Sequence, residues 1–262
     1  MKKLLSLLVL APLFMSCDNI DEADRYIDTG PVEVSRKVLL EEFTGQRCTN
    51  CPDAHQIIES LEEQYGDNLI VVSIHAGPFG IAREDDGLMQ EEGDTYANRW
   101  GISAYPAGVV DRNSGVETMD QWASTVRTDL EKMTDLQMEL EAQLNSDGSK
   151  IEVFTTLVSS ENLSGSLQLW VVENGIIGFQ IYGRDRLYDY EHNNVFRACV
   201  NGVWGQELPL SKGVVEYESN EIAVDPEWNL DNIRIVGFYY NNSGVIQVER
   251  CSLKGASSGE TD

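Results

Sequence analysis

The chain has 262 residues and a formal net charge of −25, and 42% of its residues are hydrophobic. So acidic a composition argues against nucleic acid as a partner, because phosphate binding needs clustered Lys and Arg. The hydrophobic fraction is sufficient for a packed core, and the length is sufficient for two domains.

An apolar stretch from Leu4 to Phe14 follows two lysines at the N-terminus. It is too short to cross a bilayer as a helix, which takes roughly 20 residues. We therefore interpret residues 1–16 as a secretory signal peptide. The small residue Ser16 directly before Cys17 resembles the lipobox of Gram-negative lipoproteins, in which the cysteine becomes the first residue and carries acyl chains. An ordinary signal peptide followed by a chance cysteine is the alternative.

Residues 17–34 begin with an acidic stretch that holds few large apolar side chains, and we expect them to form a flexible tether. Acidic residues behind a lipidated cysteine resemble the surface-export signals of some Gram-negative lipoproteins, and a plain solvated linker is the alternative. The expected location is the outer membrane, with lipid on Cys17 and the body on the periplasmic or the cell-surface side. No second apolar span follows, so the body itself is expected to be soluble.

A strand, a CxxC motif, a helix and a second strand follow in that order. Val38–Phe43 and Leu69–Ile74 are apolar runs typical of buried strands. The helix between them begins near Cys48-Thr-Asn-Cys51-Pro52 and ends before Gly66, and its apolar residues recur every three or four positions: Ala54, Ile57, Ile58, Leu61 and Tyr65. This order is the context in which a CxxC is interpreted as a redox motif.

A later segment resembles the cis-proline element of thioredoxins. Tyr105-Pro106 stands before the apolar run Ala107–Val110, and Pro106 is the candidate for a cis peptide bond. Asp94 is expected to cap a short helix before it, and Thr118–Met133 to form a closing helix. The resemblance covers residues 35–133 and implies an α/β thioredoxin-like domain.

The CxxC motif is predicted to carry thiol–disulfide exchange with envelope proteins. Cys48 precedes a helix N-terminus, which favours the thiolate, so we assign it as the attacking thiol and Cys51 as the resolving thiol. The resemblance implies that Glu42 is a buried proton acceptor. Two features depart from thioredoxins: Arg47 replaces the usual Trp, and residues 75–93 resemble an insertion.

The string Leu40-Glu-Glu-Phe-Thr-Gly45, followed by the CxxCP, resembles the 28-kDa outer-membrane lipoprotein family (Omp28-related). Proteins of that family pair a thioredoxin-like domain with a C-terminal β domain. The resemblance therefore implies both a fold and an outer-membrane location.

Two other interpretations of the CxxC remain open. One is a static disulfide that locks the junction of strand and helix. The other is a metal site, since His55 has ligand-like spacing from Cys48 and Cys51 and His75 follows the next strand. We predict neither a metal nor another cofactor, and we expect His192 to be a loop residue.

Residues 134–254 are predicted to form an all-β, immunoglobulin-like sandwich, followed by a flexible tail at 255–262. Leu136–Leu144 and the run from Ile151 to Leu157 alternate apolar and polar residues with a turn between them. More strands are expected at Leu167–Val172, Val195–Val200, Val214–Tyr217, Ile233–Tyr240 and Val245–Cys251.

The segment Asn174–Asn194 between two of these strands is predicted to be a long loop. Cys199 and Cys251 are the two cysteines left after Cys17 and the CxxC, and we predict a disulfide between them. The tryptophans Trp170, Trp204 and Trp228 are predicted to be core residues, with a sugar or peptide groove as the alternative.

Two functions are weighed. The first is a lipid-anchored thiol–disulfide oxidoreductase, in which Pro106 shapes the docking edge. The second is a non-enzymatic binding or structural lipoprotein in which the CxxC is a static disulfide. Exposure of Cys48 is expected to discriminate between them, because an exchange protein needs an accessible attacking thiol.

Overall fold

The computed structural model describes residues 34–85 and 87–254. The predicted signal peptide 1–16, Cys17, nearly all of the 17–34 tether and the 255–262 tail lie outside the described residues. No helix in the described part is long and apolar enough to span a membrane.

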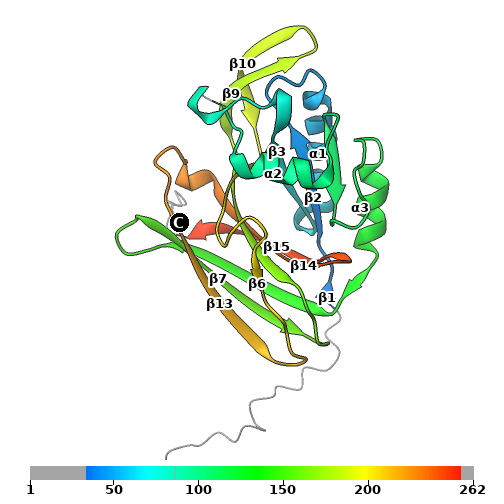
Figure 1. The fold of residues 1–262 in the computed structure, drawn as a ribbon, viewed down its shortest axis with the longest axis vertical. Helices are drawn as coiled ribbons and strands as arrows, with labels where there is room; N and C mark the ends of the chain where they lie inside the picture. Colours follow the sequence, from blue (N-terminus) through cyan, green and yellow to red (C-terminus); the bar gives the residue numbers. More distant parts are fainter. Residues whose placement is uncertain (1–33, 86, 255–262) are drawn as a thin grey trace, which may run out of the picture.

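The N-terminal part is an α/β unit (Figure 1). Strand β2 (Val38–Thr44) pairs in parallel with β3 (Leu69–His75) and antiparallel with β4 (Ala107–Val110). Helix α1 (Cys51–Tyr65) joins β2 to β3, and these three elements confirm the strand, helix and strand predicted for this region. The short strands β1 (Val34–Ser35) and β5 (Met133–Thr134) pair with each other below it.

Helices cover both faces of this three-stranded region. Helices α1 and α3 (Trp122–Leu130) pack on one face around Leu40, Ile58 and Trp122. Helix α2 (Glu91–Trp100) packs on the other face through Tyr96 and Ala97. The remaining short helical turns are 3-10 helices at Gly66–Asn68, Gly77–Phe79, Arg83–Asp85 and Leu230–Asn232.

Two predicted helix boundaries were wrong. Helix α2 begins at Glu91 rather than at Asp94, whose carboxylate instead accepts a hydrogen bond from the Gly77 N–H. Helix α3 is shorter than the predicted Thr118–Met133, because Thr118 and Gln121 bond to each other ahead of it and Met133 enters β5.

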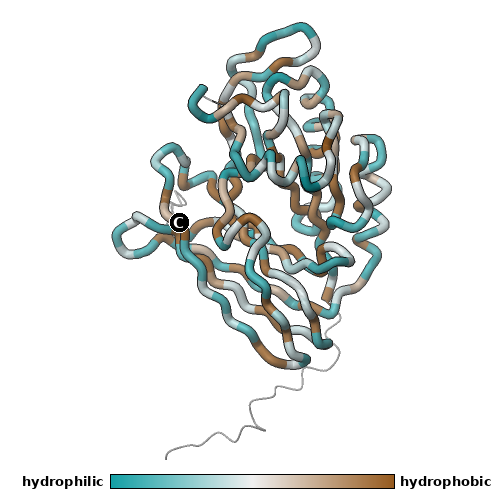
Figure 2. Tube along the Cα trace, viewed as in Figure 1, coloured by the Kyte–Doolittle hydropathy of each residue, from teal (hydrophilic) through white to brown (hydrophobic). Residues whose placement is uncertain are grey.

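The C-terminal part is built from strands that, except for the short β12, lie at or near the predicted positions. They are β6 (Leu136–Leu144), β7 (Lys150–Ser159), β8 (Ser166–Glu173), β11 (Val195–Cys199), β12 (Gln206–Glu207), β13 (Val215–Ala223), β14 (Ile233–Asn241) and β15 (Gly244–Lys254). Figure 2 shows hydrophobic residues recurring along these strands, and successive residues of β6 and β7 alternate between buried and more exposed positions.

The predicted β domain is not separated from the N-terminal unit in its sheet structure. One mixed sheet runs in the order β13-β7-β6-β15-β14-β8-β11-β3-β2-β4 and so includes the strands of the N-terminal unit. It is continuous because β11 pairs antiparallel with β8 and, through Val195 and Ser73, in parallel with β3. The sheet still encloses a two-layer core, since residues of β6 and β7 pack against residues of β8 and β14.

Residues 174–194, predicted to be a loop, form a hairpin of β9 (Ile176–Tyr182) and β10 (Asp185–His192). Gly183, with φ of 58°, provides the tight turn between the strands. The hairpin is a two-stranded sheet of its own and projects above β3 and α1 at the top of Figure 1. Its Gly, Tyr and Arg content concealed the strand pattern in the sequence.

The predicted Cys199–Cys251 disulfide is also wrong, because both cysteines are free. Cys199 lies on β11 opposite Trp170 of β8, whereas Cys251 lies on β15 opposite Ile235 of β14. Two strands separate β11 from β15, and neighbouring strands are about 4.8 Å apart. That separation exceeds the roughly 7 Å between Cα atoms that a disulfide can bridge.

Candidate functional site

The CxxC motif lies where β2 gives way to α1, and its cysteines form a disulfide. Cys48 is in the loop after β2, Cys51 is the first residue of α1, and Pro52 occupies the first turn, where its missing N–H costs nothing. The Tyr105–Pro106 peptide is cis, as predicted. Tyr105 contacts the Phe79 ring at 5.5 Å.

The β9–β10 hairpin docks on the CxxC loop, defined here as residues 45–49. Gln180, fully buried, donates from Nε2 to the Cys48 carbonyl at 2.9 Å. The Ile181 N–H donates to the Gln46 carbonyl at 2.8 Å, and the Gly183 N–H to the Thr49 carbonyl at 3.1 Å. Cys48 is only 3% exposed and Cys51 is fully buried. In this conformation the disulfide is therefore closed to a protein partner.

The insertion-like segment 75–93 supports the same loop from another direction. The Phe79 carbonyl accepts the Arg47 N–H at 2.9 Å, and the Leu88 N–H donates to the Gln46 side chain. A Cβ on Gly45 would lie 2.5 Å from the Phe79 carbonyl carbon, so only glycine permits this close approach. The Arg47 side chain is exposed.

A hydrogen-bonded group of polar side chains lies behind the loop. Glu42 of β2 is fully buried, accepts the Ser73 hydroxyl at 2.6 Å and lies 3.2 Å from His55 Nε2. The other ring nitrogen of His55, Nδ1, is 2.6 Å from the Tyr190 hydroxyl of the hairpin. The group thus connects the sheet, helix α1 and the hairpin.

All three histidines of the chain belong to this region. His75, at the end of β3, and His192, at the end of β10, contact each other edge to face at 5.4 Å. His192 Nε2 lies 3.2 Å from the Phe179 carbonyl. Neither ring nitrogen of His75 has a hydrogen-bond partner among the described residues, although the side chain is buried. We call Glu42, His55, His75, His192 and Tyr190 the histidine cluster.

The pKa values of these histidines move in opposite directions. Burial, together with the charge of nearby His55, lowers the pKa of His192 to about 4. Burial and the two other histidines hold the pKa of His75 well below its ordinary value. Burial also acts to lower the pKa of His55, but the Glu42 carboxylate outweighs it and the pKa of His55 is raised. The site therefore pairs a readily protonated imidazole with two that stay neutral.

Acidification is expected to destabilise the protein through His192. Its folded pKa of about 4 lies below the ordinary 6.5, so its stabilising contribution is complete above pH 6.5 and is lost as the pH falls toward 4. The loss amounts to about 3 kcal/mol. Urea unfolding of the parent and His192→Gln at pH 7, 6, 5 and 4 measures it: the curves of the free energy of unfolding against pH should converge toward pH 4. Parallel curves would contradict the assignment.

The structure brings Glu42, Cys48, Cys51 and His55 into one region, as the sequence indicated, but His55 bonds to Tyr190 and lies against Glu42 rather than beside free thiols. Among the described residues no group of three or more His, Cys, Asp or Glu side chains is arranged to hold a metal ion. His192, predicted to be a loop residue, is part of the site. Trp170 and Trp228 are buried, whereas Trp204 is 40% exposed.

These features define a mostly β protein with an N-terminal α/β unit that holds a closed CxxC disulfide. Residues 93–257 match the family described as outer membrane protein Omp28, and the chain belongs to that family. The match covers most of α2, then β4, α3 and the C-terminal strands; it starts after the CxxC loop and so does not include Cys48 or Cys51. No curated protein sequence matches the chain.

Solved structures show the same overall fold. HBP35 of Porphyromonas gingivalis is 15% identical, with a TM-score of 0.69 over 87% of this chain and 78% of that one. A structural-genomics protein from Agrobacterium tumefaciens is 11% identical, with a TM-score of 0.55 over 88% of this chain and 99% of that one. A domain of the outer membrane lipoprotein Omp28 from Porphyromonas gingivalis is 19% identical, but its TM-score of 0.32 is too low for an argument about fold.

Proposed function

We propose that this protein is held at the outer membrane by lipid on Cys17 and exchanges disulfides with envelope proteins through Cys48 and Cys51. Its α/β unit is thioredoxin-like in this proposal. The order β2-α1-β3 with an antiparallel β4, helices on both faces and a cis-proline before β4 supports that assignment.

The observation that carries the proposal is the histidine cluster, in which His55 lies one helical turn after Cys51 on α1 and Tyr190 belongs to the hairpin that covers the CxxC loop. Buried ionisable groups are costly unless they are paired, and a disulfide that only locks a junction needs none beside it. Here a fully buried Glu42 and every histidine of the chain gather in one place. His75 is buried in the same cluster, and neither of its ring nitrogens has a hydrogen-bond partner among the described residues. Groups with shifted pKa values concentrate at functional sites.

Exchange would run in two balanced steps. The Cys48 thiolate attacks one sulfur of a partner disulfide, so that a mixed disulfide forms and the other partner sulfur leaves as a thiolate. Cys51 then loses its proton to the Glu42 and His55 pair and attacks the Cys48 sulfur, which releases the second partner thiolate. The protein ends oxidised and the partner reduced, and the reverse sequence oxidises a partner dithiol.

The burial of Cys48 favours the rival function, a binding or structural protein with a static disulfide. Exchange therefore requires the hairpin to leave the CxxC loop for part of the time. Local opening of this kind has a lower free-energy cost than global unfolding when few contacts are lost. The two functions differ in whether that opening gives a partner access.

The reduction potential of the CxxC distinguishes them. The full chain in detergent is equilibrated in glutathione buffers, and Cys51→Ala is used to trap mixed disulfides in envelope extracts. We expect a potential between roughly −270 and −120 mV, the range of known exchange proteins, together with partners trapped through Cys48. The double variant Cys199→Ala/Cys251→Ala controls for the two free thiols. A potential below about −300 mV with no trapped partner would establish the static disulfide.

A further inference from the structure

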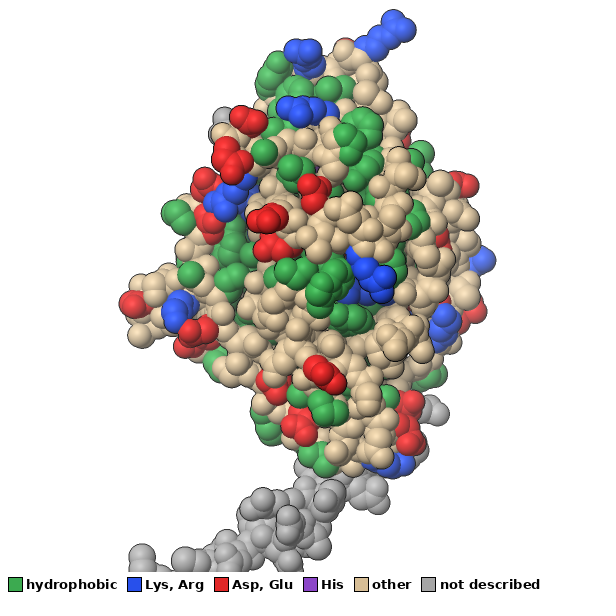
Figure 3. Space-filling view, in the orientation of Figure 1, with side chains coloured by type: hydrophobic (Ala, Val, Ile, Leu, Met, Phe, Trp, Pro, Cys, Tyr) green, Lys and Arg blue, Asp and Glu red, His purple; other side chains and the backbone are tan. Residues whose placement is uncertain are grey.

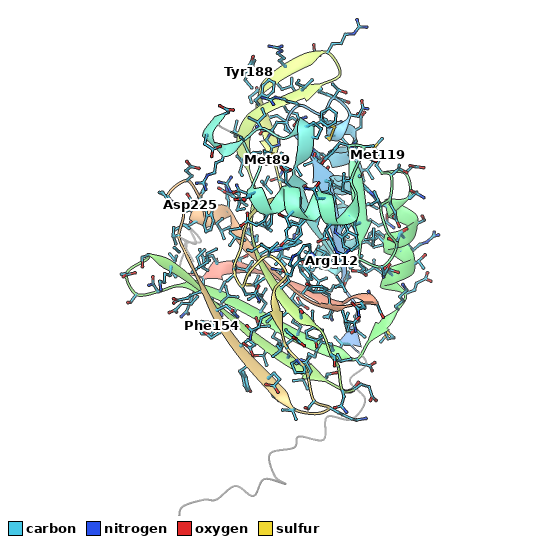
Figure 4. The ribbon with its side chains drawn as sticks, in the orientation of Figure 1. Met89, Arg112, Met119, Phe154, Tyr188 and Asp225 are labelled. Carbon is cyan, nitrogen blue, oxygen red and sulfur yellow. A yellow bond between two sulfur atoms is a disulfide. The ribbon has the colours of Figure 1, made fainter. Side chains whose placement is uncertain are left out.

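A cavity lies apart from the CxxC loop and has no part in the proposed exchange. Its volume is about 700 Å³, within the range of small-ligand sites. It is formed where the end of α2, the loop after β4, the start of β8 and the strand β12 meet. Figure 3 shows hydrophobic and Lys or Arg side chains gathered together near the centre of one face, and Figure 4 labels Arg112 in that central region.

Aromatic side chains form part of the wall, and the structure fixes them. Trp204 is 40% exposed and its ring lies 5.3 Å from that of Tyr96. The Tyr240 hydroxyl donates to the Trp204 carbonyl at 2.7 Å. Gly205, with φ of 70°, brings this loop so close to β8 that a Cβ would lie 2.2 Å from the Leu167 carbonyl oxygen. The exposed indole is therefore already positioned before any ligand arrives.

Two guanidinium groups line the cavity. Arg112 directs Nε and Nη2 to the Glu41 carboxylate, which leaves Nη1 without a hydrogen bond among the described residues. Arg99 is exposed, lies over the Trp100 ring at 5.9 Å and has no ion pair within the described part of the chain. Guanidinium forks match the geometry of a carboxylate.

The rest of the lining is neutral and polar, apart from Glu207. Hydroxyl and amide groups come from Ser164, Ser166, Asn241 and Asn242. No aliphatic side chain lines the cavity in the described structure. Peptide side chains are commonly held in aliphatic pockets, whereas sugar rings stack on aromatic faces and exchange hydrogen bonds with hydroxyls, amides and carboxylates. The lining therefore favours a sugar over a peptide.

We propose that this cavity binds a mono- or disaccharide unit that carries a carboxylate, such as a uronic or sialic acid. The sugar ring stacks on Trp204, its carboxylate pairs with Arg99 and Arg112 Nη1, and its hydroxyls bond to the serine, asparagine and Glu207 side chains. Because the protein has a net charge of −25, these two guanidinium groups are what makes the cavity receptive to an anion.

Calorimetric titration of the full chain in detergent tests the proposal. The acidic probes are digalacturonate, methyl glucuronide and sialyllactose, and their neutral counterparts are galactobiose, methyl glucoside and lactose. An acetylated tripeptide with a free C-terminal phenylalanine carboxylate serves as the peptide probe. We expect at least one acidic probe to bind about tenfold or more tightly than its neutral counterpart, the difference that one charge-assisted contact provides.

Trp204→Ala and Arg99→Gln should each weaken that binding by about tenfold or more. Tyr217→Ala, which removes a tyrosine that is 75% exposed on β13, should leave it unchanged. Arg99 is on the surface, so its variant remains informative if Trp204→Ala does not fold. The proposal is overturned if no acidic probe binds at about 10 mM, if the peptide binds more tightly than every sugar, or if both variants bind as the parent does.

Discussion

Replacing Glu41 with alanine is expected to lower the free energy of unfolding by about 3–5 kcal/mol, because it leaves a buried guanidinium without its counter-charge. Glu41 is fully buried, and its carboxylate receives Arg112 Nη2 at 2.6 Å and Nε at 3.0 Å. The Arg112 guanidinium carbon also lies 4.6 Å from the ring centroids of Phe238 and Tyr240. Cation–π contacts are worth only about 2 kcal/mol when desolvated, so they do not replace the lost carboxylate.

Urea unfolding at pH 7 measures this loss. The matched control is Glu221→Ala, which breaks the exposed ion pair with Lys150 and should cost far less than Glu41→Ala. Glu41 is the better partner to change, because Arg112 has a φ of 56° and its replacement would also alter backbone strain. A Glu41→Ala loss no larger than that of the control would mean that water reaches the guanidinium from the cavity.

The double variant Tyr182→Phe/Tyr190→Phe is expected to speed reduction of the Cys48–Cys51 disulfide by about tenfold or more. Both hydroxyls tie the hairpin to α1: Tyr182 donates to Asp53 at 2.7 Å, and Tyr190 lies 2.6 Å from His55 Nδ1. Removing them lowers the free-energy cost of lifting the hairpin. Since Cys48 is 3% exposed, that opening must precede attack by an external thiol.

The rate is measured with dithiothreitol at low concentration, by alkylation of the released thiols. Tyr188→Phe is the control on the same hairpin, because Tyr188 is 70% exposed and has no hydrogen bond among the described residues. The global unfolding free energy of each variant is measured in parallel, so that local opening is separated from general loss of stability. Equal rates in all variants would show that thiols reach the disulfide by a route that leaves the hairpin in place.

Local patterns in the sequence predicted most of the secondary structure. The apolar runs of β2 and β3 reflect strands that are buried throughout, and the alternation of β6 and β7 reflects strands that are buried on one face. Both patterns lie within a single strand, so they can be recognised without tertiary information. The Tyr105–Pro106 cis bond was predicted from the resemblance of this segment to the cis-proline element of thioredoxins.

The predictions that were wrong concern features that depend on contacts between residues far apart in the sequence. Continuity of the sheet rests largely on Val195 pairing with Ser73, a relation that no local pattern encodes. The hairpin was missed because most of its residues are exposed or only partly buried, Ile177 among them at 61%, so no regular alternation of apolar and polar residues marks its strands. The Cys199–Cys251 pairing followed from counting cysteines alone, and counting does not report which strands are neighbours.

The candidate site was only half predicted. Glu42, Cys48 and Cys51 were identified from the motif, but the part of the hairpin that covers them was not. One available signal was the scarcity of histidine. The chain has three histidines, of which His55 lies on the helix that begins at Cys51 and His75 ends the next strand. No property of the sequence placed His192 beside them, because that contact closes over more than a hundred residues.

The N-terminal strands depend on residues that are synthesised last. Arg36 donates from Nη2 to the Val245 carbonyl, Lys37 pairs with Glu249, and the face of β3 under α2 is completed by residues of β8, β11 and β14. During synthesis, residues 48–51 therefore emerge long before the hairpin that covers them. In the proposed location these cysteines meet oxidants only after export, because the cytosol keeps thiols reduced. We therefore expect the disulfide to form in the envelope before the hairpin docks, and docking of the hairpin then closes the loop.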